Sequence, residues 1–265
     1  MDPWANLVPV DDHSSARSPL DLSALQVAAG AAWDVTLLPT AGSTNEIAAA
    51  GPRPGRVVVA DHQISGRGRL DRSWTTPPGT ALTFSAVVEP SLELRHWPLL
   101  PLAAGLAVAD ALRAVGARPL LKWPNDVLLE SGKVAGILVE RIGEPGRAII
   151  GIGINVDLAA TELPVPTASA LSLEGVQVTR TDLLGGVLST LARRLADLES
   201  DPEAFVGIYR AACDTIGREV EAHLPGGIRE RGEAIGVDDS GRLQIRVGER
   251  TLAMAAGDVI HLRPV

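Results

Sequence analysis

The chain has 265 residues, of which 46% are hydrophobic and 21% charged, and its formal net charge is −8. This composition excludes collagen-like, coiled-coil and low-complexity proteins, and the length suffices for one full-sized core with a small second domain. The charge argues against a sequence-independent hold on nucleic acid, and the single Cys213 excludes an internal disulfide or a multi-cysteine zinc site.

Residues 1–20 mix proline, serine, aspartate and arginine without a helical or strand period, which predicts a flexible N-terminal arm. They contain no cationic segment followed by an apolar core, so we expect no signal peptide. No apolar run of the chain approaches the roughly 20 residues that cross a bilayer. We therefore expect a cytoplasmic protein with no membrane partner.

Residues 21–215 alternate helical and strand patterns, which predicts an α+β fold with a mixed, mostly antiparallel sheet backed by helices. Ser43 followed by Glu46 predicts a capping box that opens a short helix ending at Gly51. The other predicted helices cover 22–32, 98–115, 181–199 and 203–213. The predicted strands cover 34–38, 56–60, 80–88, 120–123, 127–130, 134–141 and 148–155.

The pattern changes after residue 215, where short apolar runs are separated by turns rich in glycine, aspartate and proline. The runs cover 219–224, 229–237, 243–247, 251–254 and 259–262. Five short strands in about fifty residues predict a small β-barrel over 216–265. Because no long linker precedes it, we expect this domain to pack on the first one.

The cationic residues are distributed unevenly by type. Of the 24 cationic residues, two are lysines, Lys122 and Lys133. Lysine and arginine replace each other on solvated surfaces, but a compact ammonium suits a site that a planar guanidinium would not fit. Chance alone could place the two lysines close together in the sequence, yet we interpret the pair as an indication of a functional site.

The segment 62–74 shows neither the helical nor the strand period and is predicted to be a loop. It contains Gly66-Arg67-Gly68-Arg69, followed by Arg72 and Trp74. Glycines allow backbone N–H groups to approach a ligand and guanidinium groups bind anions, so the segment predicts an anion clamp with an aromatic lid. A solvated loop or an RGG-like segment has the same composition, but this one lies between two apolar strands of an acidic chain.

Two more segments place polar groups at strand ends. Lys122-Trp123-Pro124-Asn125-Asp126 predicts a β-turn that brings an ammonium and a carboxylate to one strand end, where a magnesium nucleotide could bind. Gly151-Ile152-Gly153-Ile154-Asn155 ends a later strand, and its glycines permit close backbone approach. Each motif alone is also typical of an ordinary turn or a buried strand.

Taken together and in this order, the motifs resemble those of the biotin protein ligases. The resemblance covers residues 38–157 densely and the C-terminal domain more loosely. It rests on Ser43-Thr44-Asn45, Gln63, Gly66-Arg67-Gly68-Arg69, Arg72, Trp74, the turn Lys122–Asp126, Lys133-Val134-Ala135-Gly136-Ile137-Leu138-Val139-Glu140 and Gly151–Asn155. One departure is Asp71, which stands where the family's loop has a third glycine.

The resemblance implies a catalytic domain similar to those of class II aminoacyl-tRNA synthetases and biotin ligases, with an SH3-like barrel after it. It implies that biotin and MgATP form biotinyl-5′-AMP, and that the biotinyl group passes to a lysine of a biotin carboxyl carrier domain. The chain resembles the monofunctional type without an N-terminal DNA-binding domain, so no nucleic-acid partner is expected. The oligomeric state, monomer or weak homodimer, stays open.

The resemblance also implies roles for individual residues. It makes Lys133, Arg69 and Asp126 catalytic, with Asp126 helping to deprotonate the incoming lysine. The implied biotin-binding residues are Ser43, Thr44, Asn45, Gln63, Gly66, Arg67, Arg69, Lys133, Gly136 and Gly151. The implied ATP-binding residues are Arg69, Arg72, Trp74, Lys122, Asn125, Asp126, Lys133 and Asn155. The metal ligands stay unassigned.

Two other functions compete with this one. A lipoate or octanoyl ligase of similar architecture is the nearest enzyme, but the Gly-Arg loop with Trp74 and the C-terminal domain favour biotin. A biotin-responsive DNA-binding regulator is the second, but about twenty residues before the first helix are too few for a helix-turn-helix module.

Overall fold

The computed structural model describes residues 17–69, 72–143, 146–224, 227–255 and 258–262. Its main sheet has the order β1-β2-β5-β9-β8-β7-β6. β1 runs parallel to β2, and the other neighbouring pairs are antiparallel, as predicted. The strands are β1 (Asp34–Ala41), β2 (Arg56–Gln63), β5 (Ala81–Val88), β6 (Leu120–Lys122), β7 (Asp126–Leu129), β8 (Gly132–Ile142) and β9 (Arg147–Asn155).

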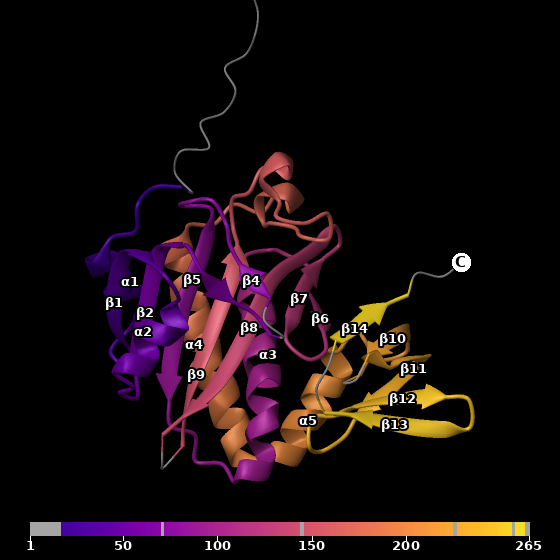
Figure 1. The fold of residues 1–265 in the computed structure, drawn as a ribbon. Helices are drawn as coiled ribbons and strands as arrows, with labels where there is room; N and C mark the ends of the chain where they lie inside the picture. Colours follow the sequence, from indigo (N-terminus) through magenta and orange to yellow (C-terminus); the bar gives the residue numbers. More distant parts are fainter. Residues whose placement is uncertain (1–16, 70–71, 144–145, 225–226, 256–257, 263–265) are drawn as a thin grey trace, which may run out of the picture.

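The two faces of this sheet are covered by helices to different extents (Figure 1). Side chains such as Phe84 and Ile152 join the large core formed with the helices on one face. On the other face α2 covers a small cluster that includes Val58 and Ile149 and leaves the rest of the sheet open. The helices are α1 (Leu22–Ala29), α2 (Thr44–Ala50), α3 (Leu100–Ala114), α4 (Arg180–Ser200) and α5 (Pro202–Ala212).

Strand alternation decides what the open face presents. Along β9, Ile150, Ile152 and Ile154 are in the helix-side core, so Gly151 and Gly153 face the open side. The same alternation places Ser85 of β5 and Gly136 of β8 there. A strip of small residues therefore lies across the middle of the open face.

Three local expectations differ from the structure. The first helix ends at Ala29 because Gly30 follows with φ of 76°, where a helix stops. Ser43 makes no side-chain capping bond, so the capping box is wrong; the Thr44 N–H instead donates to Gln63 Oε1 at 2.9 Å. The predicted loop contains a short antiparallel ladder, β3 (Gly66–Arg67) with β4 (Ser73–Trp74).

The C-terminal strands form a second, five-stranded sheet of order β13-β12-β11-β10-β14. The closed barrel is not found: in the described residues β13 and β14 remain the two edges. Hydrophobic side chains of this sheet, such as Val220 and Ile245, belong to the same core as the first domain, which gives them the burial that closure would otherwise supply. The strands are β10 (Glu219–His223), β11 (Arg229–Val237), β12 (Leu243–Val247), β13 (Arg250–Met254) and β14 (Asp258–His261).

The second sheet is fixed to the first domain through Trp123. The buried Trp123 indole donates to Gly241 O at 2.9 Å, and the Trp123 N–H donates to Thr215 Oγ1 at 3.0 Å. Gly241 has φ of 80°, and a Cβ there would lie 3.0 Å from Leu99. The turn that follows β6 thus carries one of the joints between the two sheets (Figure 1).

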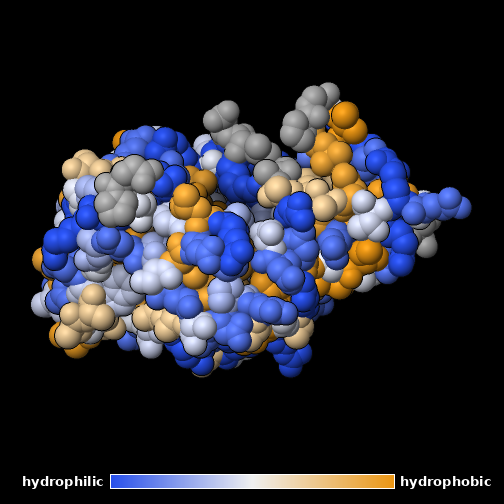
Figure 2. Space-filling view, turned by 90° about the horizontal axis from the view of Figure 1, so that it is seen from below, coloured by the Kyte–Doolittle hydropathy of each residue, from blue (hydrophilic) through white to orange (hydrophobic). Residues whose placement is uncertain are grey.

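Residues 1–16 of the expected arm lie outside the described residues, as do Leu70 and Asp71. Arg17 is bound to Asp157 and Glu162 by ion pairs, so ordered contacts begin before residue 21. Hydrophilic side chains predominate on the face seen from below, with smaller apolar patches between them (Figure 2). No helix in the described part of the chain is long and apolar enough to span a membrane.

Candidate functional site

A cavity of about 1110 Å³ opens on the uncovered face of the main sheet. Its walls come from the β3–β4 hairpin, the turn after β6, the segment 164–168 and strand β14 of the second sheet. The predicted site residues that line it are Ser43, Thr44, Asn45, Gln63, Arg67, Arg69, Arg72, Trp74, Lys122, Asn125, Asp126, Lys133, Gly136, Gly151 and Asn155. The structure therefore brings together residues that lie up to 112 positions apart, from 43 to 155.

Glycines form the floor of this cavity. Gly136 pairs with Gly153 across the β8–β9 ladder, and Gly151 is two residues further along. A Cβ at Gly153 would lie 2.5 Å from the Trp74 indole, and one at Gly151 would lie 2.2 Å from Asn45 Oδ1. Any side chain at these positions would displace the residues above it, so the floor must be glycine for Trp74 and Asn45 to lie there.

Asn45 lies at one end of the cavity in a closed hydrogen-bond network. Its Nδ2 donates to Glu140 Oε2 at 2.6 Å, and its Oδ1 accepts from the Ser85 hydroxyl at 2.5 Å. Thr44 Oγ1 lies 3.1 Å from Gln63 Oε1, to which its hydroxyl donates. Asn45 is thus held by protein groups, and Ser43, Thr44 and Gln63 are the polar residues beside it that line the cavity.

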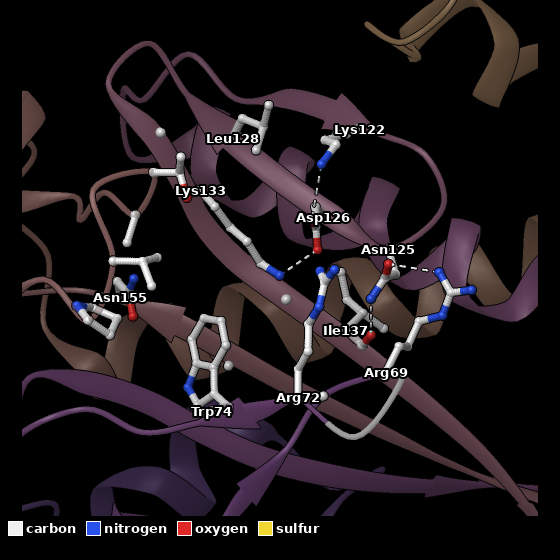
Figure 3. Close-up of a pocket in the computed structure, with 18 of the residues that line it drawn as sticks. Arg69, Arg72, Trp74, Lys122, Asn125, Asp126, Leu128, Lys133, Ile137 and Asn155 are labelled. Carbon is white, nitrogen blue, oxygen red and sulfur yellow. Dashed lines mark hydrogen bonds and ion pairs between the residues drawn. The ribbon is translucent and has the colours of Figure 1, made fainter. Parts of the chain in front are cut away.

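Asp126 lies at the centre of the site and binds both lysines of the chain (Figure 3). Lys133 Nζ is 2.6 Å from Asp126 Oδ1, and Lys122 Nζ is 3.7 Å from Asp126 Oδ2. Lys133 Nζ also lies 5.7 Å from the centre of the Trp74 ring. The two ammonium groups against one carboxylate leave a net positive charge in the cavity, as an anionic ligand requires.

The β3–β4 hairpin supplies three arginines with three different partners. Arg69 Nη1 donates to Asn125 Oδ1 at 3.2 Å, and burial lowers the pKa of Arg69. Arg72 forms an ion pair with Asp258 of the second sheet, which raises the pKa of Arg72 and lowers that of Asp258. Arg67 lies 3.6 Å from Glu140. The hairpin is therefore tied to both sheets across the cavity.

Three buried polar atoms of cavity-lining residues have no hydrogen-bond partner in the described part of the chain: Trp74 Nε1, a donor, Asn155 Oδ1, an acceptor, and Asp214 Oδ2. Asp214 Oδ2 forms an ion pair with Arg218 at 2.8 Å, which leaves the first two. The other side of the Asn155 amide is satisfied, because Nδ2 donates to Ser169 O at 2.8 Å. A buried polar atom without a partner costs free energy. The cavity therefore offers one donor and one acceptor for a ligand.

Strand β14 brings a second titratable group to the cavity besides Asp258, the imidazole of His261. Its Nε2 lies 2.9 Å from Thr215 Oγ1, the atom that accepts from the Trp123 N–H. Burial, followed by the positive charges of Lys122 and Arg218, lowers the pKa of His261 to about 4. The imidazole is therefore neutral at pH 7.

The described residues contain no group of three or more His, Cys, Asp or Glu side chains that could hold a metal ion. Asp126, the central carboxylate, is already bound by two lysines. These residues do not fit a resident Mg²⁺, which in such sites is bound largely by substrate phosphates.

The chain matches two family models that together span both sheets. The model described as the biotin/lipoate A/B protein ligase family matches residues 37–157, and that of the biotin protein ligase C terminal domain matches residues 215–262. The biotin–[acetyl-CoA-carboxylase] ligase of Mycobacterium tuberculosis is 36% identical over 95% of this chain and 99% of its own. The chain belongs to the biotin protein ligases.

Other biotin protein ligases agree with this assignment. The bifunctional ligase/repressor BirA of Bacillus subtilis is 31% identical over 83% of this chain and 70% of its own. The structure of the Aquifex aeolicus biotin protein ligase in complex with biotin and ATP has a TM-score of 0.76 and 29% identity, covering 87% of this chain and 99% of that one.

One predicted biotin protein ligase site residue, Gly66, does not line the cavity. A Cβ at Gly66 would lie 2.1 Å from Gln63 Nε2 and 2.4 Å from Trp74 O. Its role is to let Gln63 and Trp74 pass close to the backbone of the hairpin.

Several residues in or beside the cavity were not predicted as site residues from the sequence. They are Gly153, the segment Pro164–Ala168, Asp258 and His261, together with Glu140 and Ser85, which contact Asn45. Gly153 belongs to the quoted strand motif and could have been chosen with Gly151. Asp258 and His261 come from the second sheet, whose placement over the cavity depends on how the domains pack.

Proposed function

We propose that the chain is a biotin protein ligase acting in two steps on MgATP, biotin and a carrier protein. In the first step an oxygen of the biotin carboxylate attacks the α-phosphorus of ATP, which forms biotinyl-5′-AMP and releases pyrophosphate. In the second, the ε-amine of a lysine on a biotin carboxyl carrier domain attacks the acyl carbon, loses a proton and releases AMP. We propose that the reaction takes place in the cytoplasm, where ATP is available.

The observation that carries this proposal is the single cavity in which Asn45, Trp74 and Lys133 lie over a glycine floor. Adenylation brings a carboxylate against a polyanion, so the site needs fixed cations and no protein nucleophile. Cys213 is buried outside this cavity, and burial raises the pKa of its thiol. The chain thus offers cations where the reaction needs them.

Biotin is proposed to bind at the end of the cavity that holds Asn45. Ser43, Thr44 and Gln63 would hydrogen-bond the ureido ring, and Gly151 would let the ring approach the sheet. Because the Asn45 amide is already bonded to Glu140 and Ser85, we assign Asn45 to holding the shape of this end. Arg67, bound to Glu140 on the same side, would close over the ligand.

ATP is proposed to bind at the other end of the cavity. Trp74 would pack on adenine, and the unpartnered Asn155 Oδ1 would accept from the nucleotide. Arg69 and Arg72 would contact the phosphates, with Lys122 and Asn125 beside them. Mg²⁺ would enter as part of the substrate, carried on the phosphate oxygens.

Lys133 is proposed to bridge the biotin carboxylate and the α-phosphate, because it reaches Asp126 on one side and Trp74 on the other. Asp126 orients Lys133 in the free protein. For Asp126 to accept a proton from the incoming lysine, as the resemblance implies, the two ion pairs must loosen when the anionic ligands arrive.

The test is to incubate the protein with biotin, Mg²⁺ and ATP labelled at the α-phosphate. We expect a labelled adenylate that forms only when biotin is present. Biotin should then pass to a carrier domain while the label leaves with AMP, and it should not pass to the same domain with its acceptor lysine changed to arginine. Lipoate and octanoate serve as competing acids. An adenylate formed with either of these acids and not with biotin would contradict the proposal.

A further inference from the structure

The segment ahead of α1 is bound to the pocket end of the main sheet by one guanidinium. Arg17 Nε donates to Asp157 Oδ2 at 3.0 Å, and Nη2 donates to Asp157 O at 2.9 Å. The same side chain reaches both carboxylate oxygens of Glu162, at 3.2 and 2.7 Å. Its planar fork therefore holds two carboxylates of one loop together, which an ammonium would not do.

The backbone beside Arg17 is fixed independently. Arg180 of α4 has a side chain that is 1% exposed; its Nη2 donates to Ser18 O at 2.7 Å while Nη1 binds Asp61 Oδ1 at 2.7 Å. On the other side, a Cβ at Gly79 would lie 3.1 Å from Arg17 O, so the missing side chain of Gly79 leaves room for the backbone at Arg17. The position of Arg17 is thus set by groups other than its own ion pairs.

The loop that Arg17 binds continues into a wall of the cavity. Residues 164–168 line it, and Thr167 O accepts from the Lys133 N–H at 2.7 Å. The next residue but one, Ser169, donates its N–H to Lys133 O at 2.8 Å, and its own carbonyl accepts from Asn155 Nδ2 at 2.8 Å. One loop therefore connects Arg17 to the backbone of Lys133 and to the amide of Asn155.

We infer that Arg17 is a positioning residue for the nucleotide half of the site. Arg17 is not among the residues that line the cavity, so it would act through the loop and not on the substrate itself. It holds the loop from Asp157 to Ser169 so that Lys133 and the free oxygen of Asn155 face the cavity in the orientation that ATP needs. The inference rests on the proposed binding of ATP in this cavity.

The experiment compares Arg17→Ala, Arg17→Lys and Glu162→Ala with the parent in the full chain. Loss of the guanidinium should raise the dissociation constant of ATP about tenfold, which corresponds to about 1.4 kcal/mol, and that of biotin by less than about twofold. Arg17→Lys keeps one ion pair, so its dissociation constant for ATP should rise only about threefold. Because Arg17 and Glu162 act through one contact, the double variant Arg17→Ala/Glu162→Ala should bind ATP no more weakly than Arg17→Ala alone.

The matched control is Arg53→Ala, which removes an exposed ion pair with Asp34. Calorimetric titration is carried out well below the melting temperature of each variant, so that a change in stability is measured separately. Equal ATP affinity in Arg17→Ala and Arg53→Ala, or a lower melting temperature with unchanged ATP affinity, would overturn the inference. If the parent itself binds no ATP, the proposed function fails and not merely the role of Arg17.

Discussion

The ammonium of Lys133 lies beside both a carboxylate and an aromatic ring of the site. It lies 2.6 Å from Asp126 Oδ1, over the glycine floor, and a Cβ at Gly136 would be 3.1 Å from its Nζ. There is little room between this nitrogen and the glycine floor for a larger group. The residue type therefore matters more here than the charge.

Replacing Lys133 by arginine should slow adenylation more than tenfold although the charge is kept. The planar guanidinium is too broad to bridge the biotin carboxylate and the α-phosphate above Gly136. A single-turnover assay of biotinyl-AMP formation measures this step directly. Near-normal rates in Lys133→Arg would show that Lys133 is not at the reacting atoms.

Trp74→Ala should weaken ATP binding by about 1–3 kcal/mol, the range found for bases stacked on aromatic side chains. Biotin should be affected less, because the Asn45 end of the cavity does not depend on the indole. Calorimetry with each ligand separately gives the comparison. Equal losses for both ligands would mean that Trp74 supports the cavity as a whole.

At the scale of elements, the β3–β4 hairpin is the part that closes the site. Arg69 reaches Asn125 across the cavity, and Arg72 reaches the second sheet at Asp258. Two short strands with few hydrogen bonds of their own depend on such contacts for their position. An anion that binds these guanidinium groups should therefore stabilise the closed hairpin.

Arg69→Gly should release the adenylate roughly tenfold to a hundredfold faster, since a hydrogen bond to a charged group contributes about 1.5–3 kcal/mol. The variant should still form biotinyl-AMP but label bystander amines, such as those of serum albumin. The readout is biotin on albumin in a mixture that also contains the carrier domain. Tight retention of the adenylate and unlabelled albumin would rule out the hairpin as the clamp.

The elements themselves were predictable because their periodicities are local. The alternation of Ile150, Ile152 and Ile154 identifies β9 and the face it buries, and the quoted glycines then fall on the opposite face. The hairpin was missed, since segment 62–74 shows no period and its one ladder joins only two residue pairs, Gly66 with Trp74 and Arg67 with Ser73. Contacts between distant segments, such as Arg72 with Asp258 over 186 residues, leave no trace in a single sequence.

At the scale of the whole molecule, the cavity is completed where the two sheets meet. Trp123 binds Gly241 and Thr215, and Thr215 binds His261, so the turn after β6 that lines the cavity also holds the second sheet. The motif Lys122–Asp126 could be assigned to the site from its sequence. That its tryptophan joins the domains follows from the fold.

The contact between Thr215 and His261, which helps to hold the two sheets together, should make the stability of the protein depend on pH. Its pKa is about 4 in the fold against 6.5 for an ordinary histidine, so the unfolded chain binds more protons between these values. Stability should therefore be fully present above about pH 6.5 and fall as the pH drops towards 4.

Melting temperatures at pH 7.5 and 5.0 test this dependence. His261→Gln keeps an acceptor for Thr215 but does not titrate, so its melting temperature should fall less on acidification than that of the parent. For a chain of this size each kcal/mol corresponds to about 2–4 °C. His62→Gln is the control, and an equal fall in the parent, His261→Gln and His62→Gln would exclude His261 as the cause.

The ion pairs of Lys122 and Lys133 with Asp126 also limit which amines the protein exposes. An acyl adenylate acylates amines, whereas guanidinium groups stay protonated and do not react. Of the 24 cationic side chains two are lysines, and both face the same carboxylate inside the site. Intermediate that escapes into solution therefore meets arginine, and not lysine, over the surface of the enzyme that made it, so the composition of the ligase limits the labelling of its own side chains.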